Sequence, residues 1–186
     1  PDAGIAQAPS TSLPNTATLS YLDAGGNTVV DPARLVSSDT LTLRQPVMSP
    51  IAKLGNGASN TATTPLNVNV AAGTVHFQLR SCNTSGLAPA YSVKFTDVLA
   101  SQLNESSITS PVVVVGGTTL TAGTGYVYTP PAGRGGSMIF VLNTPVDPGQ
   151  CVTVDYTIGF HTDFGPNQTW NNSAALNEYW SLPAAS

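Results

Sequence analysis

The stretch Thr74-Val75-His76-Phe77-Gln78-Leu79-Arg80 alternates between apolar and polar residues. A period of two places neighbouring side chains on opposite faces of a strand, so this stretch predicts a half-buried β-strand. The same alternation recurs over 152–160, and β-branched or aromatic runs bounded by Gly, Pro, Asn and Ser occupy 91–97, 111–115, 125–128 and 138–142. No convincing amphipathic helix accompanies them. The sequence therefore predicts an all-β fold, a sandwich of two antiparallel sheets around one core.

The composition is poor in charge. Charged residues make up 9% of the 186 residues, against about 25% in an average soluble protein. A net charge of −4 with six Lys and Arg residues provides no positive field for nucleic acid or acidic membranes, so both are excluded as partners. No apolar run reaches the roughly 18 residues that a transmembrane helix needs, so we expect no membrane insertion within this chain. The surface chemistry favours an extracellular protein, and a start at Pro1 rather than Met predicts a processed or excised piece.

The two cysteines, Cys82 and Cys151, lie far apart in the sequence with no nearby pair of histidines. This spacing argues against a zinc site and leaves a disulfide or two unrelated thiols. Both occupy outward positions of their predicted strands, where unpaired thiols are disfavoured in an oxidising compartment. We therefore predict a disulfide between Cys82 and Cys151.

The two ends of the chain resemble each other, since residues 11–21 can be laid over 168–178 through Asn15-Thr-Ala17 and Asn172-Ser-Ala174. Such a copy is typical of a tandem array cut so that the tail of the preceding repeat remains. It is also compatible with a donor strand that fills a groove in a neighbouring molecule, or with chance. Prolines at 46 and 50 mark a boundary. We predict an N-terminal strand segment over 1–45, packed partly outside the main domain or against another molecule, and a β-sandwich over 46–186.

Four motifs carry a family resemblance and occur in the family's order: Ile51-Ala-Lys53, residues 76–99, Asp147-Pro-Gly-Gln150-Cys with the strand after it, and Asn172-Ser-Ala174. Together they resemble the conserved-repeat domain of large prokaryotic cell-surface proteins, which is similar to isopeptide-forming fimbrial and adhesin domains. The resemblance covers most of 46–186. It implies an immunoglobulin-like sandwich in a stalk, filament, sheath or adhesin on a bacterial or archaeal surface. The two cysteines and the shortened run after Lys53 depart from the family pattern.

The resemblance also implies an amide bond between Lys53 and Asn172, formed once with loss of ammonia and assisted by Asp97. Strand parity permits all three side chains to face the core, whereas Lys94, the only other lysine, takes the face opposite Phe95. Burial would lower the pKa of the lysine toward a neutral nucleophile and keep the acid protonated. The alternative is a solvated Lys53, a turn-capping Asp97 and an Asn172 that bonds to the backbone.

The remaining candidates carry weaker signals. His76 and His161 take the polar faces of their strands, which is typical of solvated histidines. Asp155 and Asp163 flank His161 without the regular oxygen spacing of a calcium loop, so we predict no metal and no cofactor. Three aromatic residues near the C-terminus could form a sugar-stacking platform or plug the core or an interface: Trp170, Tyr179 and Trp180.

No nucleophile, base and orienting acid come together by spacing, so we expect no turnover enzyme. The leading hypothesis is a structural repeat or subunit that assembles with neighbouring copies through its N-terminal segment. The alternative is a glycan- or protein-binding module of a bacterial adhesin.

Overall fold

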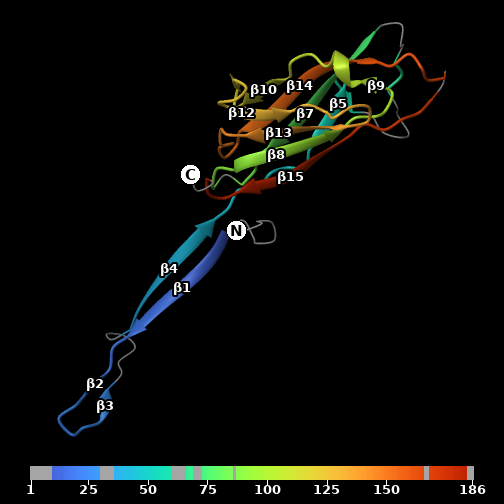
Figure 1. The fold of residues 1–186 in the computed structure, drawn as a ribbon. Helices are drawn as coiled ribbons and strands as arrows, with labels where there is room; N and C mark the ends of the chain where they lie inside the picture. The colour runs from blue at the N-terminus through green and yellow to red at the C-terminus, as the bar shows by residue number, and fades with distance from the viewer. Residues whose placement is uncertain are drawn as a thin grey trace.

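The computed structural model describes residues 10–29, 36–59, 66–68, 73–85, 87–165 and 168–183. Within these ranges the chain consists of strands and loops, with one short 3-10 turn at Glu105–Ser107 and no α-helix. Every strand ladder is antiparallel. The all-β prediction is confirmed, and the two facing sheets form the expected immunoglobulin-like antiparallel sandwich (Figure 1).

The larger sheet has the strand order β11-β10-β14-β7-β5-β6, and β9 pairs with β14 beside this path. Its strands are β5 (Ala52–Gly55), β6 (Ala58–Ser59), β7 (Thr74–Cys82), β9 (Leu103–Asn104), β10 (Val112–Val115), β11 (Thr118–Thr119) and β14 (Cys151–Phe160). The long central pair β7 and β14 runs in register from Cys151 opposite Cys82 to Gly159 opposite Thr74. These two strands are the segments whose alternation was clearest in the sequence.

The smaller sheet has the order β12-β13-β8-β15. Its strands are β8 (Tyr91–Val98), β12 (Tyr126–Thr129), β13 (Ser137–Leu142) and β15 (Ser173–Trp180). β8 therefore lies between β13 and β15, which makes its inward side chains the centre of this layer. All six strands predicted from alternation or from β-branched and aromatic runs are present in the two sheets, and their ends differ from the expected bounds by only one or two residues.

The core fills the space between the sheets with the inward half of each alternating strand. Phe77 and Leu79 from β7 meet Phe95 from β8 and Phe140 from β13 in this layer, and each is at most 6% exposed. Burying such side chains is the main favourable term in folding, at roughly 1.5–3 kcal/mol each. Among the described residues only one charged side chain is fully buried, that of Asp97.

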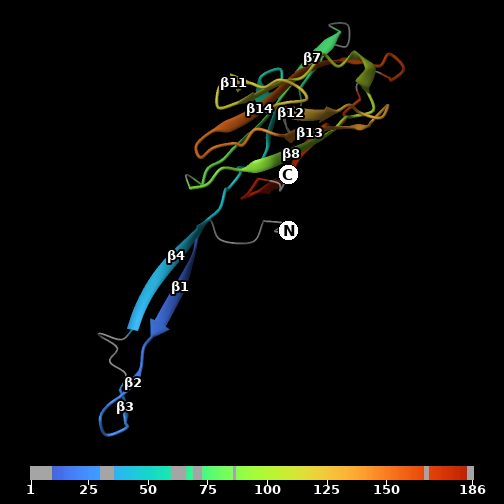
Figure 2. The same ribbon diagram turned by 60° about the vertical axis from the view of Figure 1, so that its left-hand side comes forward.

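The N-terminal part of the chain forms a separate two-stranded ribbon. β1 (Ser10–Thr18) pairs with β4 (Val36–Arg44), and β2 (Tyr21–Leu22) pairs with β3 (Thr28–Val29) around a turn that the carboxylate of Asp23 supports. Neither pair joins a sheet of the sandwich. Figures 1 and 2 both show the ribbon projecting away from the sandwich, which it reaches through the residues after β4. The Gly25-Gly26 stretch forms the turn, where Gly26 has a φ of 79°.

The described residues include no helix long and apolar enough to cross a membrane.

Candidate cross-link site

Asp97 lies near the end of β8, an internal strand of the smaller sheet, opposite Met138 of β13 on one side and Ala174 of β15 on the other. Because it shares the inward face of β8 with Phe95, its carboxyl group points into the core and is fully buried. A lone buried carboxylate would be strongly disfavoured, so its partners decide what it does. One oxygen, Oδ1, receives the ammonium of Lys53, and the other, Oδ2, accepts a hydrogen bond from the hydroxyl of Tyr156 at 2.6 Å.

Lys53 reaches Asp97 from the opposite layer. It lies on β5, the first strand of the sandwich, opposite Leu79 of β7, and only 14% of its side chain is exposed. Its Nζ also lies 4.8 Å from the centre of the Phe77 ring, close enough for a cation–π contact. Burial lowers the pKa of Lys53, while the negative charge of Asp97 opposes this shift and does not cancel it. The site therefore brings the lysine closer to its neutral, nucleophilic form.

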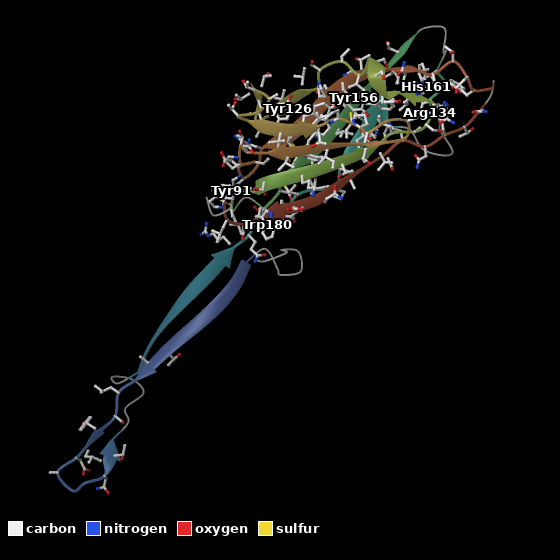
Figure 3. The ribbon with its side chains drawn as sticks, in the orientation of Figure 1. Tyr91, Tyr126, Arg134, Tyr156, His161 and Trp180 are labelled. Carbon is white, nitrogen blue, oxygen red and sulfur yellow. A yellow bond between two sulfur atoms is a disulfide. The ribbon has the colours of Figure 1, made fainter. Side chains whose placement is uncertain are left out.

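Tyr156 supplies the third group of the cluster. It lies on β14 with its ring between the two sheets, 5.6 Å from the ring of Phe77, and Figure 3 shows it inside the sandwich. Burial raises the pKa of Tyr156, and the negative charge of Asp97 raises it further. Its phenol therefore keeps its proton and acts as a hydrogen-bond donor.

Asn172 directly precedes β15, at the edge of the smaller sheet. Both polar atoms of its side-chain amide are buried, and neither has a partner with hydrogen-bond geometry. The amide nevertheless lies close enough to the Tyr156 hydroxyl to lower the pKa of that phenol, against the larger effects of burial and of Asp97. An unpaired buried amide costs about 1–3 kcal/mol, and buried polar groups without a partner are rare. This side chain therefore calls for an explanation.

The structure thus places the residues of the expected trio around one buried carboxylate. Lys53 contacts Asp97 directly, and Asn172 lies beside Tyr156, which contacts the same Asp97. Lys94 is on the outer face of β8, where its Nζ lies 3.5 Å from Glu178. Tyr156 was not among the candidate residues from sequence. Its signal was a hydroxyl at an inward position of β14, because a buried tyrosine hydroxyl usually has a polar partner.

A disulfide joins Cys82 and Cys151, which lie directly opposite each other at one end of the β7–β14 ladder with their Cα atoms 3.9 Å apart. The guanidinium of Arg80 lies next to it, with Nη2 3.1 Å from the sulfur of Cys151. The described residues contain no unpaired cysteine. The bridge lies within one sheet and holds its two central strands together.

The histidines and the scattered acids form separate pairs. His76 lies 3.2 Å from Asp155, and His161 lies 3.0 Å from Glu105, both measured from Nε2 to a carboxylate oxygen. Arg134 holds Asp163 with two contacts of 2.5 and 3.0 Å. In the part of the chain that the structure describes, no three side chains of His, Cys, Asp or Glu converge as metal ligands would.

The three C-terminal aromatic residues do not gather in one place. The ring of Trp170 packs against Phe160 with their centres 6.2 Å apart, before β15 begins. Trp180 lies at the far end of the same strand, opposite Tyr91, and Figure 3 shows these two at the end of the sandwich nearest the ribbon. Trp170 precedes β15 and Trp180 ends it, so the length of an eight-residue strand, on the order of 25 Å, separates the two, and they do not form one stacking platform.

No protein-family model and no curated protein matches the sequence. The structure is similar to the Bacillus cereus major pilin subunit BcpA (13% identity, TM-score 0.48), the Corynebacterium diphtheriae major pilin SpaA (15%, 0.47) and the collagen-binding domain of the Erysipelothrix rhusiopathiae surface protein RspB (16%, 0.41). The alignments cover 84%, 81% and 91% of this chain, and 41%, 44% and 52% of those chains. The chain thus spans about half or less of the length of these structures.

Proposed function

We propose that this chain is a structural repeat or subunit of an extracellular stalk, filament, sheath or adhesin, and that an amide bond between Lys53 and Asn172 locks its sandwich. The observation that carries the proposal is the buried side-chain amide of Asn172, which has no hydrogen-bond partner beside the Lys53–Asp97–Tyr156 cluster. If the amine of Lys53 displaces ammonia from this amide, the position of Asn172 beside the cluster is explained.

The chemistry follows from burial. Lys53 passes a proton to Asp97, which leaves a neutral amine and a neutral acid in a region where charge is disfavoured. The amine nitrogen attacks Cγ of Asn172, the new C–N bond forms, and the bond from Cγ to Nδ2 breaks. Two protons leave Lys53 in total, one of which stays on Asp97 while the other departs with Nδ2 as ammonia.

The bond would connect the two layers at the ends of the domain. Lys53 lies on β5, the first strand of the larger sheet, and Asn172 lies directly before β15, the last strand of the smaller one. Tension applied to the two ends of the sandwich would then pass through this covalent link, and the strands between them would carry little of it. This property suits a surface stalk.

Assembly is the second part of the proposal. The ribbon of β1 and β4 shares no sheet with the sandwich, and a two-stranded ribbon alone is at best marginally stable in water. We therefore infer that residues 1–45 contact a neighbouring repeat or an identical subunit. The low charge of the chain and the disulfide of Cys82 and Cys151 agree with an oxidising, extracellular setting.

Intact mass under reducing conditions tests the bond. We expect the full chain to weigh less than its sequence by one ammonia, and a peptide that links Lys53 to Asn172 to appear after digestion. The variants Lys53→Met and Asn172→Leu should both show their full sequence mass. Lys94→Met is the matched control, because it removes the other lysine of the chain and should keep the loss.

One other reaction also releases ammonia, namely succinimide formation at the exposed Asn56-Gly57 turn. The Lys53→Met variant separates the two, since it retains Asn56. A full sequence mass for the unaltered chain would contradict the proposed bond, and so would an ammonia loss that persists in Lys53→Met.

The ligand-binding alternative has less support, because the three aromatic residues that would form a stacking platform do not cluster.

A further inference from the structure

The hydroxyl of Tyr156 lies between the acid and the amide of the proposed reaction. It donates to Oδ2 of Asp97 at 2.6 Å. Asn172 lies two residues before Ala174, the residue of β15 that pairs with Asp97, and its buried amide is near enough to the phenol to lower the pKa of Tyr156. The tyrosine is 2% exposed, so water has little access to this hydroxyl.

The contacts of Asp97 leave a gap in the proton path. Its two oxygens are taken by Lys53 and Tyr156, and among the described residues no hydrogen bond joins its carboxylate to Asn172. The proton that Asp97 receives from Lys53 therefore needs a carrier to reach Nδ2, the nitrogen that departs. Tyr156 is the group that faces both.

We propose that Tyr156 carries this proton, as the proton-transfer residue between Asp97 and the leaving nitrogen of Asn172. The inference rests on the proposed bond between Lys53 and Asn172. As the bond from Cγ to Nδ2 breaks, the phenol gives its proton to Nδ2, and the protonated Asp97 returns one to the phenol oxygen. Tyr156 ends as it began, the second proton from Lys53 restores the acid form of Asp97, and ammonia leaves.

The surroundings of Tyr156 suit this role. The titratable groups that face it are Lys53 of β5, Asp97 of β8 and Tyr128 of β12. Burial and the negative charge of Asp97 raise the pKa of Tyr156, so its phenol holds a proton to donate at neutral pH. Its proton leaves only in a concerted transfer that Asp97 completes.

The test follows the rate of ammonia loss after a pulse of cell-free synthesis of the full chain, quenched in acid and weighed intact. We expect Tyr156→Phe to slow bond formation by about 100-fold, the lower range for general acid catalysis. Tyr126→Phe is the matched control, because it removes a second buried tyrosine hydroxyl that lies outside the site. That hydroxyl donates a 3.0 Å hydrogen bond to the carbonyl of Pro111. This control should form the bond at the unaltered rate.

The pH profile distinguishes proton transfer from a packing role. In Tyr156→Phe the departing nitrogen must take its proton from solvent, so the remaining rate should rise as the pH falls, more steeply than in the unaltered chain. A packing defect would slow the reaction equally at every pH. Replacing Tyr156 by 3-fluorotyrosine keeps the ring and the hydroxyl but makes the phenol more acidic, and we expect it to raise the rate even where Tyr156→Phe fails to fold.

The failure of the inference can be told apart from the failure of the proposed bond. If the unaltered chain never loses ammonia, the proposed bond and this inference both fall. If it does, and Tyr156→Phe reacts at the unaltered rate or keeps the unaltered pH profile, the inference fails and the bond stands. An unchanged rate with 3-fluorotyrosine also contradicts proton transfer by Tyr156.

Discussion

Lys53 and Asp97 face each other in an interior that solvates neither charge. A buried ion pair gains little net stability, because the loss of hydration offsets most of the attraction. Conversion of Lys53 to an amide and of Asp97 to its neutral acid would remove both charges from the core. The proposed reaction therefore relieves the cost of the arrangement that makes it possible.

The pH dependence of stability is expected to report on Lys53 when the bond cannot form. In Asn172→Leu the lysine still titrates, and burial holds its folded-state pKa below its unfolded value of 10.5. Between these two values the unfolded chain binds more protons than the folded one, so the free energy of unfolding rises with pH in that window. Urea unfolding from neutral pH to about pH 9.5 measures it, below the range where Tyr128 and Tyr156, whose pKa values are raised, would contribute the opposite slope.

The double variant Lys53→Met/Asn172→Leu removes the titrating amine, so its free energy of unfolding should not show this rise with pH. Equal slopes in the single and double variants would assign the effect to another group.

The sequence predicted three of the four residues of the site. Lys53, Asp97 and Asn172 were proposed through a family resemblance, and parity on each strand permitted them to face inward. Tyr156 was missed because a tyrosine at an inward strand position is equally typical of a packed core residue and of a hydroxyl with a buried polar partner. Only the layer spacing, which brings β14 opposite β8, shows that its hydroxyl reaches a carboxylate.

At the scale of elements, alternation identified the long strands because one face of each is buried and the other is not. β7 shows this in full, with Val75, Phe77 and Leu79 buried and His76 exposed. The pairing of β1 with β4 was not predicted, since it joins residues far apart in the sequence over a run rich in Ser and Thr. Alternation predicts that a segment is a strand, but it does not predict which other strand pairs with it.

The tight turn between β10 and β11 depends on glycine. Gly117 has a φ of 87°, in the left-handed region, although nothing lies within 4 Å of the position that a Cβ would take. Gly117→Ala should therefore lower the free energy of unfolding by about 1–2 kcal/mol through backbone strain alone. Gly165→Ala is the matched control, because its backbone is outside this region and its nearest contact, at 3.5 Å, is ordinary. Equal losses in the two variants, measured by urea unfolding, would contradict the explanation.

At the scale of the whole molecule, the ribbon raises the question of what it binds. If it joins a neighbouring copy, the full chain should self-associate with rising concentration in sedimentation velocity. The double variant Thr16→Pro/Ala17→Pro should reduce this association, because hydrogen-bonded and non-hydrogen-bonded positions alternate along β1 and one of the two prolines must remove a ladder bond.

Leu182→Pro provides the control, at an exposed site outside the strands. A monomer at all concentrations, or equal association in both variants, would count against assembly through residues 1–45.

The bridge between Cys82 and Cys151 also limits how far the molecule can lengthen. It closes a loop of 69 residue steps that contains β8 through β13. At about 3.3 Å for each extended residue, roughly 230 Å of backbone stays stored inside that loop while the sulfurs remain joined. In Asn172→Leu, where no amide bond would take up the tension, a chain unravelled from its ends would stop well short of its full length at this bridge, and reductant would release the stored part as a single additional length.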